Sequence, residues 1–305
     1  MTRNQGFAYR ELIRQPGLSV LAHFVRQHRH SDEAQWRARI EAGEVELDGR
    51  RPQPETLMAA GQELVWHRPP WQEPEVDSRI PVLYEDAALL AVYKPRGLPT
   101  LPGGGYLEHT LIALVRARHG ECSPMHRLGR GTSGIVLFSR DQAASAALQS
   151  AWREHRIAKR YRALGSGVAA ADRFPITAAI GPVPHPWLGT LFAADPGGKP
   201  SRSVAEVLER RAQATLFAVD IETGRPHQIR IHLAFAGHPL VGDPLYGPGG
   251  LPMAGIIALP GDCGYFLHAE RLAFAHPVTG LGLELRAAPP PELLTISEQS
   301  ATGSV

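Results

Sequence analysis

The residues best suited to chemistry lie in one string of 25 residues, TGRPHQIRIHLAFAGHPLVGDPLYG, at positions 223–247. Pro226 suits the first position of a helix, Gly237 can supply a left-handed cap, and Pro239 prevents any continuation. Apolar residues recur between them at helical spacing, at Ile229, Leu233 and Ala236. The pattern predicts a short helix of about three turns with one apolar face. Its first turns carry Arg225, His227 and Arg230. A helix N-terminus with added guanidinium groups is suited to bind a phosphate or a carboxylate.

A second candidate region runs from position 126 to position 162. Glycines 129, 131 and 134 indicate a loop, Ile135–Phe138 a buried strand, and Asp141 the N-cap of a helix that carries Ala144, Leu148 and Trp152. The alternation over Ala158–Leu164 then predicts a half-buried strand with Arg160 and Arg162 on one face and Tyr161 on the other. Residues 127–162 contain eight Lys or Arg residues and only two acids, Asp141 and Glu154. It is the one segment basic enough to attract a phosphate backbone.

These strings resemble the signatures of the RluA-type RNA pseudouridine synthases. HRLGRGTSGIVLFSRD, from His126, is similar to the family's HRLDxxTSGLLLxA, and the string from Thr223 is similar to TGRxHQIRxHLaxxGHPlxGDxxYG. KPRGLP from Lys94 and KRYRA from Lys159 resemble two shorter family segments, and the likeness covers roughly residues 80–287. It implies an α+β fold, with a mixed, mostly antiparallel central sheet, flanking helices and a central basic cleft.

The resemblance also implies the reaction and its residues. A uridine of structured ribosomal or transfer RNA would flip into the cleft and be isomerised to pseudouridine, without metal or cofactor. By resemblance Tyr161 is the active-site tyrosine, Arg230 pairs with the catalytic carboxylate, and position 129 holds that carboxylate. We expect RNA contacts from seven further residues: Arg127, Arg130, Arg156, Lys159, Arg160, Arg225 and His227.

One position departs from the family, because Gly129 stands where the family has its catalytic aspartate. Glycine cannot be a nucleophile or a base. Two other acids could be considered as substitutes for the missing carboxylate. Asp141 lies about 13 Å away at the far end of a strand, where it is explained as a helix cap. Asp243 is explained by ordering its own turn. Two alternatives therefore stay open beside the synthase: an RNA-binding homologue without isomerase activity, and a branch of the family that positions its chemistry differently.

Two other classes of enzyme have weaker patterns. GTSGI at 131–135 partly matches the G-x-S-x-G serine hydrolase motif, but its fifth residue is Ile135 and Ser133 precedes its strand. His227, His232 and His238 have no common zinc spacing, which favours hydrogen-bonded structural roles for His232 and His238.

Length and composition set the wider frame. The 305 residues carry a net charge of +2, so RNA affinity must come from local clusters. We expect a small RNA-binding module that resembles the ribosomal protein S-four module at 1–67, a Pro-rich linker at 68–78, a catalytic domain at 79–288 and a disordered tail at 289–305. Two cysteines and no long apolar run predict a cytoplasmic protein that contacts no membrane, and we expect a monomer.

Overall fold

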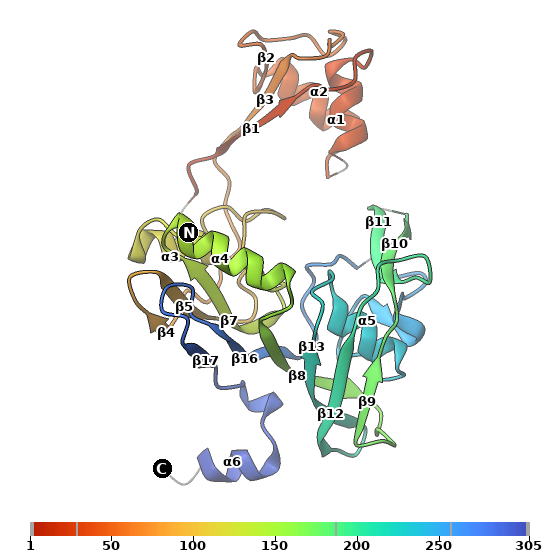
Figure 1. The fold of residues 1–305 in the computed structure, drawn as a ribbon. Coiled ribbons are helices and arrows are strands. Elements are labelled where there is room, and N and C mark those ends of the chain that lie inside the picture. The colour runs from red at the N-terminus through yellow and green to blue at the C-terminus, as the bar shows by residue number, and fades with distance from the viewer. Residues whose placement is uncertain (1–2, 29, 187, 257, 303–305) are drawn as a thin grey trace. The chain divides into compact units, whose positions relative to one another are not determined.

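The computed structural model describes residues 3–28, 30–186, 188–256 and 258–302, which form two compact units, 1–73 and 74–305 (Figure 1). No helix within these described ranges is long and apolar enough to cross a bilayer. The unit boundary differs from the expected end of the module at residue 67. Asn4 explains the difference, since its side chain accepts the N–H of Trp71 and donates to Glu73, which attaches the first part of the predicted linker to the first unit.

The first unit is a three-stranded antiparallel sheet covered by two helices. Its elements are β1 (Phe7–Leu12), α1 (Val20–Gln27), α2 (Glu33–Glu41), β2 (Val45–Leu47) and β3 (Glu63–Arg68), with strand order β1-β3-β2. The chain turns after β2 at Asp48 and Gly49, which both have positive φ. The sequence reading missed β1. The core lies between sheet and helices, around Phe24, Trp36 and Trp66.

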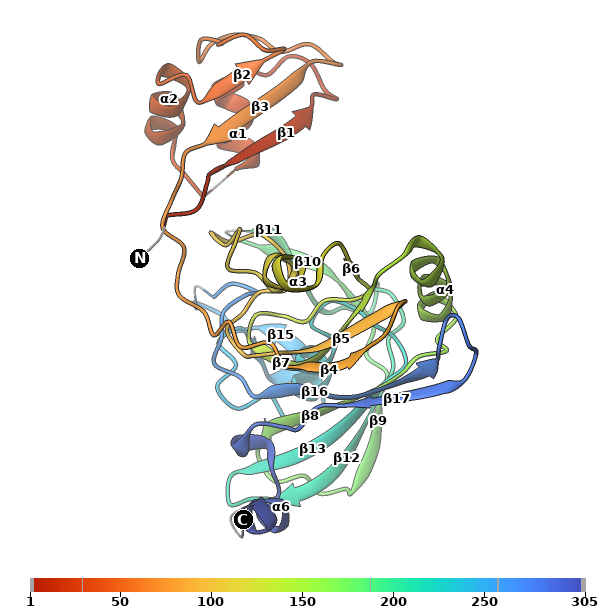
Figure 2. The same cartoon turned by 90° about the vertical axis from the view of Figure 1, so that its left-hand side faces the viewer.

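The second unit is built on one ten-stranded sheet (Figure 2). Along it the order is β4-β5-β7-β16-β8-β13-β12-β9, with β6 paired to β7 and β17 to β16. The strands are β4 (Val82–Glu85), β5 (Leu89–Lys94), β6 (Ser123–Pro124), β7 (Thr132–Ser139), β8 (Ala158–Ser166), β9 (Arg173–Ile176), β12 (Ser203–Arg210), β13 (Ala214–Ile221), β16 (Leu267–Ala275) and β17 (Gly282–Arg286). The remaining elements are α3 (Leu111–His119), α4 (Gln142–Arg153), the hairpin of β10 (Ile180–His185) and β11 (Gly189–Ala194), α5 (Gln228–Phe235), β14 (Tyr246–Gly247), β15 (Leu251–Pro252) and α6 (Ile296–Thr302).

The sheet confirms the expected mixed, mostly antiparallel α+β fold. Of its described pairings only β7 with β16 is parallel, and this pairing lies at the centre. Figure 1 shows α4 beside the β5–β7 half and α5 beside the β12–β13 half. Gly134 permits the central contact, because a Cβ there would lie 2.3 Å from the carbonyl oxygen of Ala269. The start of β7, the middle of β8 and the start of β16 therefore come together.

Two local expectations are wrong. The helix around Arg230 begins at Gln228 rather than at Pro226, because His227 takes a left-handed conformation (φ +56°). It has eight residues rather than three turns, and it is buried on nearly all sides rather than on one face. The tail from residue 289 is ordered as far as Thr302: Leu293 is buried, and Glu298 pairs with both terminal nitrogens of Arg162. Residues 303–305 lie outside the described range.

Candidate active site

A cavity of about 370 Å³ opens at the centre of the sheet in the second unit. The loop before β7, the middle of β8, the N-terminal end of α5 and the start of β16 form its walls. The predicted site residues that line it are Arg127, Gly129, Lys159, Tyr161, Arg225, His227 and Arg230. Its volume is within the range usual for small-molecule sites. The structure therefore brings these seven residues to one cavity, while their chemical roles stay predictions.

Three predicted RNA contacts do not line the cavity. Arg130 donates to the carbonyl oxygen of Gly261 and to the hydroxyl of Tyr106. Arg156 pairs with Glu154, two residues before it, and Arg160 pairs with Glu206 of β12. The sequence reading counted the charge of residues 127–162 along the chain. This count does not include the acids that β12, β16 and α6 bring to β8, so it overstates the positive charge of the surface.

The loop at position 129 is held from several sides. Its carbonyl oxygen accepts the N–H of Thr132, and the next carbonyl, of Arg130, accepts the N–H of Gly97. The buried Lys94 ammonium donates to the carbonyl oxygens of Pro95 and Leu98 and lies 3.4 Å from that of Arg130. Gly129 is outside the left-handed region, so its backbone would accept any residue. The loop is thus pre-formed for a side chain that this chain does not have.

Space for that side chain exists but is partly used by Tyr265. A Cβ on residue 129 would lie 3.1 Å from the Tyr265 hydroxyl oxygen and 3.7 Å from the Thr132 hydroxyl oxygen. The first distance requires a shift of a few tenths of an ångström at the far end of a side chain. A Cβ on Gly131 would collide with the same ring, at 2.8 Å. Tyr265 belongs to a segment that resembles the closing strands of the family, and the sequence assigned it no role in the site.

Arg230 already has a carboxylate partner. Its Nε and Nη2 donate to the two oxygens of Asp243, each at 2.7 Å, and Nη1 donates to the carbonyl oxygen of Pro260. Both side chains are almost fully buried, at 2% and 1% exposure. Asp243 also accepts the N–H groups of Leu245 and Tyr246, which confirms that it orders its turn. Arg230 is therefore satisfied without a carboxylate at position 129.

Tyr161 presents its ring and hydroxyl to the cavity from β8, opposite Ala269 of β16. Burial raises the pKa of its phenol to about 12. The phenol therefore keeps its proton at neutral pH. It can pack against a base and donate a hydrogen bond, but it offers no phenolate.

His227 differs from the predicted RNA contact because it is neutral and mostly covered. The Tyr246 hydroxyl donates to the carbonyl oxygen of Phe192 at 2.6 Å, so it can only accept from Nδ1 of His227 at 2.7 Å. Nδ1 therefore carries the proton, which leaves the Nε2 lone pair without a partner among the described residues. Burial, followed by the charges of Arg230 and Arg127, lowers the pKa of His227 to about 4. His227 is thus a fixed hydrogen-bond acceptor in the cavity wall.

The cavity is basic and holds no acid. All of its lining residues are described, and none is Asp or Glu. Five of them are cationic: Arg127, Lys159, Arg225, Arg271 and Arg230, the last of which is paired with Asp243. Asp243 is covered by Arg230, and Asp141 caps α4 by accepting the N–H of Ala144, as predicted. The arrangement can therefore bind an anionic, aromatic group, and it lacks a carboxylate nucleophile.

Neither minor class of enzyme gains a site. Ser133 does contact a histidine, with 2.9 Å between Oγ and Nδ1 of His268, but these residues are 4% and 0% exposed. The other ring nitrogen of His268 donates to the carbonyl oxygen of Ala287, so the pair has no acid. His232 bonds to Ser203 and His238 to the carbonyl oxygen of Ser166, which confirms two structural histidines.

Sequence comparisons relate the chain to known proteins of one family. A family model described as RNA pseudouridylate synthase matches residues 88–235. The chain is 43% identical to an uncharacterized RNA pseudouridine synthase of Synechocystis sp. over 278 residues, which cover 90% of this chain and 96% of the relative. It is 32% identical to ribosomal large subunit pseudouridine synthase D of Neisseria meningitidis, with 90% of this chain and 76% of that protein covered.

A solved structure supports the fold. The chain is similar to human RNA pseudouridylate synthase domain containing 1, with a TM-score of 0.58. The likeness covers 76% of this chain and 97% of that one at 24% sequence identity. At this identity the likeness supports the fold alone.

Proposed function

Because this chain belongs to the RNA pseudouridine synthase family, we propose that it takes one uridine of a structured RNA into the cavity beside Gly129 and isomerises it to pseudouridine. One observation carries the proposal: Tyr161, Arg230 and the loop of residue 129 come from three separate parts of the chain and border one cavity. The relative named for the ribosomal large subunit favours ribosomal RNA as the substrate, with transfer RNA as the alternative outcome.

The ring of Tyr161 stacks on the flipped base, and the surrounding cations bind the RNA phosphates. Flipping a base out of its stack costs a few kcal/mol, and stacking on an aromatic ring offsets part of this cost. Arg127 and Arg225 at the cavity wall are placed to contact phosphates on either side of the flipped nucleotide. Because every lining charge is positive, affinity should fall steeply with salt.

The reaction needs no atom from outside the substrate. The bond between N1 of uracil and C1′ of ribose breaks, the base turns, a bond from C5 to C1′ forms, and the proton of C5 is finally replaced by one on N1. We assign Nε2 of His227 as the acceptor of the C5 proton, because its lone pair lies in the cavity wall whereas Tyr161 keeps its own proton. Bound phosphates would raise the pKa of His227 and make it a better base.

The missing carboxylate limits this proposal and supports a second candidate. A carboxylate at position 129 would act on the ribose or uracil as nucleophile or base. Without it we expect slow turnover. The absence of any acid from the lining specifically favours an RNA-binding homologue that does not isomerise.

Release of tritium separates the two candidates. RNA labelled at C5 of uridine should lose tritium when incubated with the wild-type protein, at a low rate. Tyr161→Ala should lose both this release and part of the RNA affinity, whereas Arg156→Ala, which is outside the cavity, should change neither. RNA binding that depends on Tyr161 without any release of label would establish the inactive binder instead.

We also propose that the protein acts in the cytoplasm. Cys122 and Cys263 are both free, which fits a reducing compartment. The expected monomer stays a prediction, and sedimentation of the purified chain checks it.

A further inference from the structure

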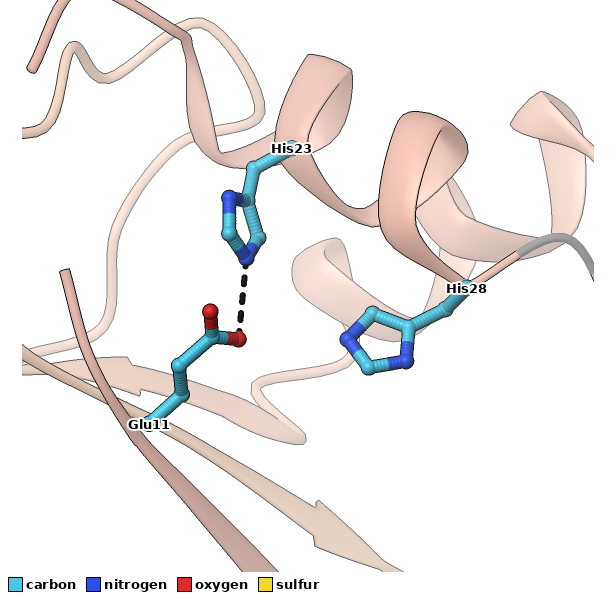
Figure 3. A group of neighbouring side chains, drawn as sticks. All are labelled: Glu11, His23 and His28. Carbon is cyan, nitrogen blue, oxygen red and sulfur yellow. Dashed lines mark hydrogen bonds and ion pairs between the residues drawn. The ribbon is translucent and has the colours of Figure 1, made fainter. Parts of the chain in front are cut away.

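Three side chains that could ligate a metal meet in the first unit, far in sequence from the cavity. Glu11 lies on β1, His23 on α1, and His28 is the residue at which α1 ends. Each offers one ligand atom, and these atoms all lie within 4.8 Å of one another (Figure 3). The sequence reading did not find them, because 12 and 5 residues separate neighbouring members of the group, and no zinc motif has this spacing.

The local fold explains how the two histidines share one side. Residues five apart on a continuous helix point in directions about 140° apart. The helix ends at Gln27, and His28 leaves the helical conformation (φ −118°, ψ 67°) while its N–H still donates to the carbonyl oxygen of Phe24. This turn brings its ring back, to a centroid distance of 6.3 Å from the ring of His23. Figure 3 shows both rings directed toward the Glu11 carboxylate.

Hydrogen bonding explains only part of the group. His23 Nε2 lies 3.0 Å from a Glu11 carboxylate oxygen, which satisfies these two residues as a pair. The ring nitrogens of His28 have no hydrogen-bond partner among the described residues, although the ring packs on Phe24 and Trp36. His28 thus places an imidazole whose ring nitrogens bond to no described residue beside the Glu11 carboxylate and the His23 imidazole. This is the arrangement expected of a metal site without its ion.

We propose that Glu11, His23 and His28 bind one divalent ion of the zinc class, with a fourth position left for water. Two imidazoles and a carboxylate form an established zinc ligand set, with bond lengths of about 2.0–2.2 Å. Tetrahedral ligands at that distance lie roughly 3.4 Å apart, so ligand atoms that lie within 4.8 Å of one another must approach by up to about 1.4 Å. Glu11 can move this far because 47% of its side chain is exposed, and a surface hollow lined by Glu11 and His28 admits the ion from solvent.

The ion would fasten β1 to the C-terminal end of α1. β1 is an edge strand, paired on one side only, to β3. Cross-linking it to the helix would stabilise the first unit by the free energy of binding the ion. The site is therefore structural, and it is independent of the reaction in the second unit.

The test uses the full chain, freed of metal with a chelator and titrated with Zn²⁺ by calorimetry and with Co²⁺ by visible absorption. The wild type should bind one equivalent at this site, and its thermal midpoint should rise with Zn²⁺. Glu11→Gln keeps an oxygen that accepts from His23 but removes the charge. We expect it and His28→Gln to weaken binding at least about tenfold and to abolish the rise in midpoint.

A matched control lies in the same unit. His67 Nε2 and a Glu46 carboxylate oxygen are 3.2 Å apart, but within the described residues no third His, Cys, Asp or Glu completes a metal-ligand group with this pair, so His67→Gln should bind Zn²⁺ like the wild type. The metal-free circular dichroism spectrum of Glu11→Gln should match that of the wild type, which shows that the variant is folded. The proposal is overturned if the wild type binds no Zn²⁺, or if Glu11→Gln and His28→Gln bind it as tightly as His67→Gln does.

Discussion

Replacing Gly129 by aspartate should restore the carboxylate that the cavity lacks. The backbone at 129 accepts any residue, and the loop is already fixed by its bonds to Thr132 and Gly97. The new Cβ requires only that the Tyr265 hydroxyl move by a few tenths of an ångström. The new carboxylate would enter a cavity whose charged lining residues are all cations, which should keep it ionised.

The expected gain follows from what such a group contributes. A positioned acid or base group accelerates a reaction by about 10²–10⁴, which is a barrier lower by roughly 2.7–5.5 kcal/mol. Displacing Tyr265 should cost on the order of 1–3 kcal/mol of stability. We therefore predict that Gly129→Asp isomerises uridine at least about 100-fold faster than the wild type, and that it melts a few degrees lower.

Tritium release from C5-labelled RNA measures the rate, and Gly129→Asn is the matched control. Asparagine has the same shape and meets Tyr265 in the same way, but it is neither nucleophile nor base. Equal rates for the Asp and Asn variants, with RNA affinity unchanged, would refute the reasoning. Fast turnover by the wild type itself would show that the chemistry does not need a carboxylate at 129.

Further predictions concern stability and the proton acceptor. Asp243→Asn leaves the buried Arg230 guanidinium without a charged partner and should cost about 3–5 kcal/mol in urea unfolding, whereas Glu284→Gln, at the exposed pair with Arg271, should cost much less. His227→Gln should abolish the isomerase activity of Gly129→Asp while RNA binding persists; retained activity would exclude His227 as the proton acceptor. Burial lowers the pKa of His268 to about 4, so below pH 6.5 the unfolded chain binds a proton that the folded chain does not bind. The free energy of unfolding should therefore fall by up to about 1.4 kcal/mol per pH unit between pH 6.5 and 4. His268→Asn should reduce this slope, and an unchanged slope would contradict the assignment. Leu293→Ala should cost about 2–5 kcal/mol, since Leu293 is 1% exposed; a cost near zero would show that the segment after residue 288 is not docked.

The sequence predicted the parts of the site that short-range patterns encode. The alternation around Tyr161 placed its side chain on the face of β8 that borders the cavity, and glycines 129 and 131 correctly indicated the loop before β7. Gly134, which was expected in the loop, lies inside β7. The convergence on one cavity came from the family resemblance, because nothing local in the sequence states that β7, β8 and β16 are neighbours.

What the sequence could not predict depends on partners that are distant along the chain. Asp243 satisfies Arg230 from 13 residues away, and Glu298 neutralises Arg162 from 136 residues away. The tautomer of His227 is set by Tyr246, whose own proton is fixed by Phe192. The polar composition of the tail suggested disorder, but the burial of Leu293 and the ion pair of Glu298 with Arg162 of β8 hold the segment as far as Thr302.

The central claim is that a uridine is isomerised in the cavity between residue 129 and Tyr161. A pseudouridine map of total RNA from cells with and without this gene tests it most directly, with the deletion complemented by the wild type or by Tyr161→Ala. The account predicts at least one uridine, in ribosomal RNA, whose modification disappears on deletion and returns with the wild type but not with Tyr161→Ala. An identical map in all four strains would contradict it.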